Sequence, residues 1–228
     1  FTKNQTSTFI PNYEAAIIRP NVFGHFQDLL LATAKSPAML TFLDNSSSVG
    51  AKANSKNNKG LNENYARELM ELHTLGVDGG YSQNDVTEAA RILTGWTIYP
   101  MQGVGEKRVK TIENNPKNRH DGDFLFLINN HDLGNKMVLT HQFANNGYQE
   151  GVDLIHMLAN AESTANFISK KLATKFVCDT PSSELLSKMK DTFLKTNGDI
   201  TQVLITMVNS LEFWSKNNIG NKVKSPFE

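Results

Sequence analysis

The sequence is poor in the features that usually announce a function. Its 228 residues include a single cysteine, Cys178, which excludes an internal disulfide framework. Neither sign of charge is in excess, because 23 Lys and Arg residues are balanced by 23 Asp and Glu residues. This balance gives no reason to expect nucleic acid as a partner. No apolar run approaches the roughly 18–20 residues of a membrane-spanning helix, so no transmembrane segment is expected.

Several catalytic signatures are missing too. The sequence has no glycine-rich loop that could cradle a phosphate, no Gly-x-Ser-x-Gly elbow and no Cys-x-x-Cys pair. The two histidines of a zinc-protease helix, placed one turn apart, are also absent. The length is enough to bury roughly 70% of the unfolded surface, so a single domain over residues 1–228 is the simplest expectation.

The most informative segment is a short, highly charged stretch over residues 61–76. Asn62 can accept a hydrogen bond from free backbone N–H groups at its amino end, and Gly76 can take the left-handed conformation that closes its carboxyl end. These signals predict a helix. At roughly 100° per residue, its polar side carries the following residues: Glu63, Arg67, Glu71 and Thr74, with Asn64 and Glu68 at the edge. Tyr65 falls on the opposite, apolar side.

Two interpretations of this stripe stay open. A solvated ladder of alternating charge, from Glu63 to Arg67 to Glu71, would contribute only about 0.2–0.5 kcal/mol per pair. Alternatively, the carboxylates line a cleft in which Arg67 keeps some of them ionised while another binds a metal or moves a proton. If the role of these charged residues is structural instead, a buried network fixes the register of the helix. Its members are Asn62, Glu63, Asn64, Tyr65 and Arg67.

Two His-Asp dipeptides flank the best strand candidate, residues 124–128. They are His120-Asp121 and His131-Asp132. Imidazole nitrogen and carboxylate oxygen are the usual ligands of zinc, manganese and non-haem iron. The same dipeptide is also common in turns, where the Asp side chain stabilises the backbone, so the pattern alone does not decide between the two roles.

The hypothesis for a site joins the charged helix to the second His-Asp pair. It places a divalent metal as cofactor on Glu68, Glu71, His131 and Asp132. Candidate catalytic residues are Glu68, Glu71 and His131, which would activate water or hold a substrate if they converged in one cleft.

The pattern of apolar residues predicts a mainly α fold, an irregular multi-helix bundle with one small β-hairpin or pair of short strands. Residues 124–128 and 136–139 are the expected strand partners. Residues 45–60 read as a mobile polar loop, and residues 97–122 as an irregular insertion. The predicted helices cover residues 21–34, 36–43, 61–76, 82–94, 149–159, 163–177, 183–196 and 200–210. Ser82 with Asp85 forms a variant capping box at the start of one of them.

These motifs also resemble a known family. The resemblance rests on residues 36–45, 61–76, 81–96, 210–214 and 222–228, together with His131-Asp132-Leu133-Gly134-Asn135-Lys136. Together they are similar to the signature of a large bacterial family named domain of unknown function 1800. The resemblance spans nearly the whole chain and implies that it is a piece of a longer protein, with missing flanks that supply further residues.

The resemblance leaves the function open, because that family has no established activity. It implies an exported protein, located in the periplasm, in the cell envelope or outside the cell. We therefore expect a helical domain with a structural or binding role, whose partner is an extracellular polymer or a protein. The alternative is a metal-dependent, hydrolase-like enzyme that acts on an extracellular polymer such as polysaccharide through a carboxylate and histidine cluster.

Overall fold

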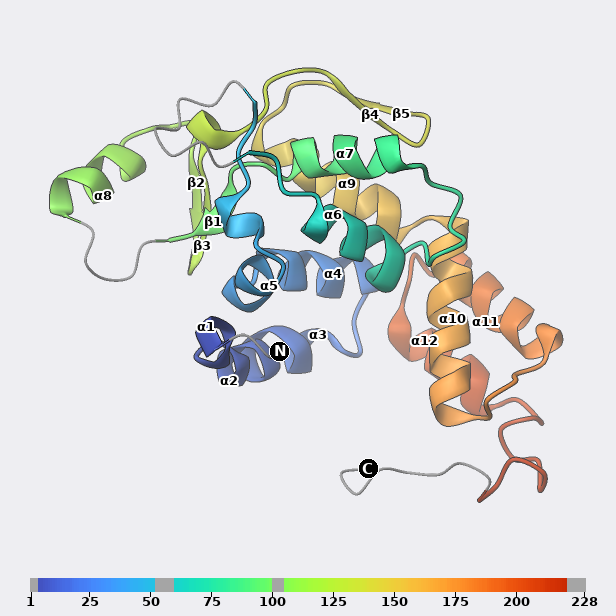
Figure 1. Cartoon of the computed structure of the whole chain (residues 1–228). Coiled ribbons are helices and arrows are strands. Elements are labelled where there is room, and N and C mark those ends of the chain that lie inside the picture. The colour runs from blue at the N-terminus through green and yellow to red at the C-terminus, as the bar shows by residue number, and fades with distance from the viewer. Residues whose placement is uncertain (1–3, 52–59, 100–104, 221–228) are drawn as a thin grey trace.

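The computed structural model describes residues 4–51, 60–99 and 105–220. It is mainly helical with two small antiparallel sheets, as predicted (Figure 1). The helices of the first half are α1 (Asn4–Ser7), α2 (Ile10–Asn12), the π-helix η1 (Tyr13–Ile18), α3 (Arg19–Asn21), α4 (Phe26–Lys35), α5 (Pro37–Phe42), the 3-10 helix η2 (Asn45–Ser47), α6 (Asn64–Glu68), the π-helix η3 (Leu69–His73) and α7 (Gln83–Ile92). The later ones are α8 (Glu106–Glu113), the 3-10 helix η4 (Ile128–Asn130), α9 (Tyr148–Ala159), α10 (Glu162–Phe176), α11 (Ser183–Lys195) and α12 (Ile200–Val208).

Local signals in the sequence place most of these boundaries. Ser82 and Asp85 form the predicted capping box of α7, in which each side chain accepts from the other residue's backbone N–H. Asp199 accepts from the N–H of Gln202 and caps α12. Gly76 follows η3 with a φ of 85°, a left-handed conformation that glycine adopts without steric cost.

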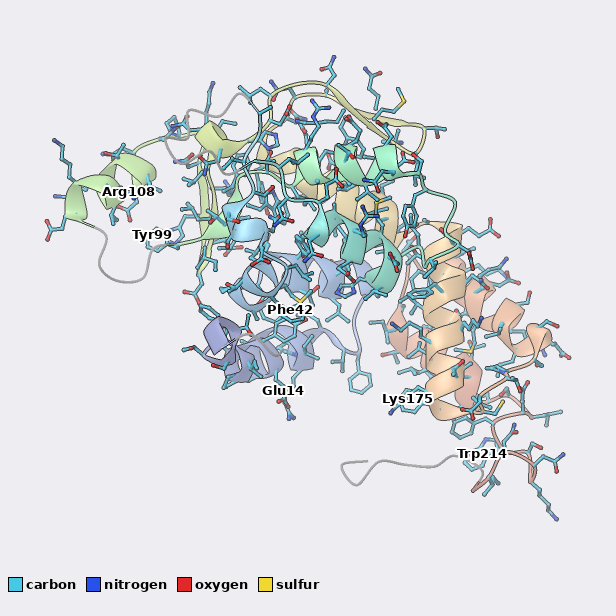
Figure 2. All side chains as sticks on the ribbon, viewed as in Figure 1. Glu14, Phe42, Tyr99, Arg108, Lys175 and Trp214 are labelled. Atoms are coloured by element: carbon cyan, nitrogen blue, oxygen red, sulfur yellow. The ribbon has the colours of Figure 1, made fainter. Side chains whose placement is uncertain are left out.

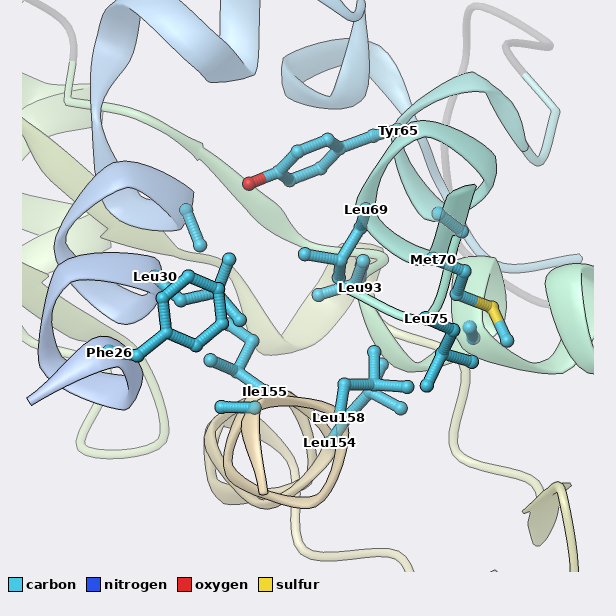
Figure 3. Packing of buried hydrophobic residues seen from close by; sticks show 14 of the residues in the cluster. Phe26, Leu30, Tyr65, Leu69, Met70, Leu75, Leu93, Leu154, Ile155 and Leu158 are labelled. Carbon is cyan, nitrogen blue, oxygen red and sulfur yellow. The ribbon is translucent and has the colours of Figure 1, made fainter. Parts of the chain in front are cut away.

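The core lies where α4, α6 with η3, and α9 meet (Figure 3). Phe26 and Leu30 enter it from α4, and Tyr65 enters from α6 with only 1% of its surface exposed. Leu154 and Ile155 close it from α9. At roughly 25 cal/mol per Å² of apolar surface, burial of such side chains is the main stabilising contribution to the fold. Within the described residues, no helix is long and apolar enough to cross a membrane.

The strands pair differently from the prediction. The three-stranded sheet has the order β1 (Trp96–Ile98), β3 (Phe124–Phe126), β2 (Arg119–Asp121), and the second sheet pairs β4 (Lys136–Val138) with β5 (His141–Phe143). The expected pairing of β3 with β4 across the His131 turn is therefore wrong. All three residues of β3 are buried, and a strand of this kind needs a hydrogen-bonded neighbour on both edges. Helix η4 then turns the chain away before His131.

Trp96 lies fully buried at the start of β1, directly after the glycine that ends α7. Its indole stacks on Tyr148 with ring centroids 5.6 Å apart. A Cβ atom on Gly151 would lie 2.4 Å from the indole, so α9 can approach Trp96 only with glycine at this position. Trp96 thus packs back onto the protein directly after α7.

Three segments differ from their predictions. Asn45 and residues 48–50 are buried, and the Asn45 amide donates to the carbonyl oxygens of Leu93 and Trp96 at 3.2 Å, so the start of the predicted polar loop is part of the fold. Residues 52–59 of that loop lie outside the described residues. The predicted irregular insertion contains α8 and β2, and its residues 100–104 also lie outside them. Phe23 is 70% exposed, because the predicted helix 21–34 begins only at Phe26.

Helices α10, α11 and α12 stand together at one end of the molecule, and α8 projects at the other (Figure 1). The four helices predicted for the last third of the chain are all present within a few residues of their expected bounds. Between these two ends, α7, α9 and the segment that leads into β4 bring the functional candidates together.

Candidate functional site

A buried group of three charged or titratable side chains lies between the His131 turn and α9. The Nζ atom of Lys136 lies 2.6 Å from Oε2 of Glu150, and Nε2 of His131 lies 3.6 Å from the same oxygen. The side chains of His131 and Lys136 are 0% exposed and that of Glu150 is 1% exposed. Removing such charges from water is costly, so the arrangement persists only because each charged atom has a partner.

The remaining polar atoms of this buried group are also bonded. Nδ1 of His131 lies 2.9 Å from the carbonyl oxygen of Thr94. A carbonyl oxygen only accepts, so Nδ1 carries a proton. Nε2 lies 3.4 Å from Nζ of Lys136, close to the ion pair that Lys136 makes with Glu150. The backbone N–H of Asn146 donates to Oε1 of Glu150 at 2.7 Å, and Lys136 donates to the carbonyl oxygen of Asp132.

These contacts set the charge of Glu150. Burial alone would raise the pKa of its carboxyl group, but the hydrogen bonds from His131, Lys136 and the Asn146 N–H lower that pKa below its ordinary value. Glu150 is therefore an anion at neutral pH. The pair of Lys136 with Glu150 is a buried ion pair, and losing either partner would leave the other charge uncompensated.

A second network lies directly beside the first and is centred on Arg91 of α7. Nε and Nη2 of Arg91 donate to the two carboxylate oxygens of Asp132 at 3.2 and 2.9 Å. Nη1 donates to both oxygens of Glu88 at 2.7 and 2.8 Å. Gly134 lets the guanidinium lie against the chain, because a Cβ atom there would be 2.6 Å from Nη2. Such two-point contacts between arginine and carboxylate fix geometry as well as charge.

The electrostatics of this second network follow from the same contacts. Burial would raise the pKa of Asp132, but the bonds from Arg91 and from the Gly134 N–H lower it below its usual range. The hydrogen bond to Asp132 in turn raises the pKa of Arg91. Both groups are thus charged at neutral pH.

Carboxylates of α7 also hold the strand that follows. Oε2 of Glu88 accepts from the N–H of Met137 at 3.2 Å, and Oδ1 of Asp85 accepts from the N–H of Leu139 at 2.6 Å. The segment from Asp132 to Leu139 is therefore attached to α7 by side chains along most of its length. This attachment explains why β4 pairs with β5 and not with β3.

A cavity of about 840 Å³ opens over these networks. Arg91, His131, Asp132 and Gly134 line one side of it. The rest of the lining is Ala51, Asn115, Lys117, Ile128, Asn129 and Leu133. The Gly50 N–H donates to the carbonyl oxygen of Asn130 at 2.9 Å, which holds the chain before Ala51 against the wall. The cavity is thus bounded by segments far apart in the sequence.

The structure does not bring the two halves of the predicted metal site together. His131 and Asp132 belong to the networks just described, whereas Glu68 and Glu71 act on Tyr81, whose pKa is raised by burial and then mainly by the charge of Glu71. Within the described parts of the chain, no three His, Cys, Asp or Glu side chains gather as metal ligands would. The converging cluster of Glu68, Glu71, His131 and Asp132 therefore stays a prediction, to be tested by the metal content of the purified protein.

The charged stripe itself is half-exposed. Arg67 lies 3.5 Å from Glu63, with side-chain exposures of 39% and 33%, and it donates to Gln83 at 2.7 Å. The predicted step from Arg67 to Glu71 does not form an ion pair, although both residues are described. The π-helix η3 begins at Leu69 and widens the turn, so the four-residue spacing no longer aligns the two side chains.

The residues of the predicted structural network make local contacts. Asn62 accepts from the N–H of Asn64 at 2.9 Å, but the residue that caps α6 is Glu63, which makes no side-chain cap hydrogen bond, so the predicted cap lies one residue too early. The N–H of Asn62 donates to Ser48 at 3.1 Å. Tyr65 points into the core on the opposite side of the helix, as predicted. These contacts attach the start of α6 to the chain near η2, and they are separate from the His131 network.

The other His-Asp pair takes no part in the site. His120 and Asp121 are exposed on β2. The His120 ring stacks on Tyr99 with centroids 3.9 Å apart, and Asp121 pairs with Lys35 at 3.2 Å. Their contacts are of the structural kind that the sequence left open.

Sequence reasoning missed Glu150 and the role of Arg91. Glu150 could have been found, because it lies on the apolar stripe of α9 that continues through Leu154 and Leu158, where an isolated carboxylate needs a buried cation. Lys136 stood in a recognised motif, but nothing in the sequence indicated that its ammonium group is buried. No sequence feature pointed to the pairing of Arg91 with Asp132, because the two residues are 41 positions apart.

The fold and site together define a mainly helical domain in which a charged, internally paired turn forms one wall of a cavity. Over residues 1–228 the chain matches the family model described as "Protein of unknown function (DUF1800)", and it belongs to that family. The resemblance seen in its motifs is thereby confirmed. Neither the curated proteins nor the solved structures include a match to this chain.

Proposed function

We propose that this chain is a binding domain of an exported or envelope-associated bacterial protein, and that its cavity receives a polar partner. The observation that carries the proposal is that the polar groups of the His131 turn are already bonded to one another. Both ring nitrogens of His131 have partners, and both oxygens of Asp132 accept from Arg91. A wall of this kind is rigid and offers a fixed surface for recognition.

The same observation weighs against chemistry at this turn. A general base or metal ligand needs a free lone pair directed at the reacting atom or ion. Asp132 and Glu150 would have to abandon Arg91 and Lys136 to provide one, and each would then leave a cation in a largely buried setting. Their depressed pKa values also make them weak proton acceptors at neutral pH.

Export and an extracellular partner are supported by the family to which the chain belongs. Family relatives commonly look like exported proteins, and a cavity with Asn, Lys and Arg side chains suits a hydroxylated polymer or a polar protein surface. The metal-dependent enzyme acting on such a polymer remains the competing function, with Glu68 and Glu71, which form no ion pair among the described residues, as its candidate carboxylates.

Metal content decides between the two functions. The protein should be purified without chelator and analysed for transition metals, together with His131→Ala and Glu71→Ala variants. A binding domain carries no stoichiometric metal. Stoichiometric metal in the original chain that is lost in both variants would overturn the proposal in favour of the enzyme. As a control, Glu184→Ala removes an exposed carboxylate from α11 and should leave metal content unchanged.

A further inference from the structure

A second hollow adjoins the cavity over the His131 turn. It has a volume of about 620 Å³ and lies against α8 and the chain that follows β3. Asn115 and Asn129 line both hollows, so the two adjoin along these residues and can be treated together as one groove. We call it the amide groove. Its length, from Gly134 at one end to Gly105 at the other, suits a chain molecule better than a single small ion.

Cations dominate the charge of the amide groove. Its lining includes Arg91, Lys107, Arg108 and Lys117, and its only carboxylate among the described residues is Asp132. Asp132 is already neutralised by Arg91. Lys107, Arg108 and Lys117 are exposed, and none of them has an ion-pair partner in the described chain. Because the whole chain is neutral, this local excess is a feature of the groove and not of the composition.

Amide side chains account for much of the remaining polar lining. These are Asn115, Asn118, Asn129 and Asn130. Asn118 is committed to the fold, because it donates to Ile112 at 2.9 Å and accepts from the Ile128 N–H at 3.1 Å. The Asn129 side chain is exposed and makes no hydrogen bond within the described chain. A free amide offers one acceptor and two donors, the combination that a sugar hydroxyl can satisfy in both directions.

We infer that the amide groove binds an anionic glycan chain, with Lys107, Arg108 and Lys117 pairing with its carboxylates and Asn129 with its hydroxyls. This inference rests on the proposed binding function. The described lining contains no aromatic side chain on which a neutral sugar ring could stack, so charge must supply much of the affinity. Figure 2 shows Arg108 on α8 at the opposite end of the molecule from Lys175 on α10, the helix that also carries Lys170.

The test uses the full chain and a linear polyuronate, with affinity measured by calorimetry and by affinity electrophoresis. A triple variant, Lys107→Gln, Arg108→Gln and Lys117→Gln, should bind about threefold to a hundredfold more weakly, since each exposed ion pair strengthens binding by about 1.4-fold to fivefold. The control changes three exposed lysines elsewhere, Lys170→Gln, Lys195→Gln and Lys216→Gln. It alters net charge equally and should leave the affinity unchanged.

Two further arms separate a glycan site from a general cation surface. Asn129→Ala should weaken polyuronate binding about threefold to tenfold and have no effect on poly-glutamate. Equal binding of both polymers, or an unchanged affinity in Asn129→Ala, overturns the glycan assignment in favour of an acidic peptide or simple ion exchange. Failure of the polyuronate to bind also overturns it. In every case, the metal analysis above reports on the proposed function separately.

Discussion

The exposed charged stripe and the buried charged cluster of the described chain differ in burial. The stripe on α6 and η3 is half-exposed, and its ion pair between Arg67 and Glu63 is 3.5 Å long. The cluster of Lys136, Glu150 and His131 is buried, with an ion pair of 2.6 Å. The sequence makes the first cluster conspicuous and hides the second, because adjacent charges stand out in a sequence whereas burial depends on tertiary contacts.

The comparison shows which cluster the fold depends on. In water, solvation competes with an exposed pair, so the stripe contributes little. In the interior, an unpaired charge costs several kcal/mol, so each member of the buried cluster requires the others. Charged residues that define this fold are therefore those whose partners are distant in sequence.

The largest expected effect comes from breaking the buried pair. Glu150→Ala leaves the Lys136 ammonium group without a counterion in the interior, and we expect a loss of about 3–5 kcal/mol in the free energy of unfolding. Denaturant unfolding measures it. The double variant Lys136→Met with Glu150→Leu should lose less than Glu150→Ala alone, because no charge is stranded. A loss below about 1 kcal/mol in the single variant would contradict the assigned burial.

Removing the guanidinium of the second network should have an intermediate effect. Arg91→Ala leaves Asp132 and Glu88 without their donor, and we expect a loss of roughly 1–3 kcal/mol. Arg91→Lys should recover only part of it, since an ammonium group cannot match both carboxylates with two-point contacts. Full recovery of stability by lysine, measured by the same unfolding experiment, would contradict this expectation. It would show that a positive charge at position 91 stabilises the fold without two-point contacts.

Acidification should destabilise the protein in a defined range. The folded-state pKa values of Asp132 and Glu150 lie below their ordinary values, so their contribution is fully present above about pH 4–5 and is lost as the pH falls through the depressed values. Thermal unfolding between pH 7 and pH 3 measures this loss. In Arg91→Ala the slope should be shallower, because Asp132 has lost the partner that depresses its pKa.

The smallest effect is expected at the exposed stripe. Arg67→Ala removes a pair whose side chains are 39% and 33% exposed, and the loss should be no more than about 0.5 kcal/mol. Glu71→Ala serves as the reference, because Glu71 forms no ion pair within the described chain. A loss at Arg67 as large as that at Arg91 would remove the distinction between the two clusters.

The sequence was sufficient for features that depend on neighbours in the chain. The caps at Ser82 and Asp199, the end of η3 at Gly76 and the helices of the last third were all predictable, because each follows from a few adjacent residues. Strand pairing and the partner of Lys136 were not. Those depend on which segments meet in space, and the apolar run 124–126 does not reveal on which edges it will be paired.

The π-helix η3 gives the molecule an unusual register. A wide turn of this type holds one residue more than an α-helical turn would, so every side chain after it is rotated by about 100° relative to a regular helix. Shortening the stretch from Leu69 to His73 by a single residue would restore ordinary phase. Arg67 would then face a different side chain, and the Gly76 turn would lose its contact with the Phe167 ring.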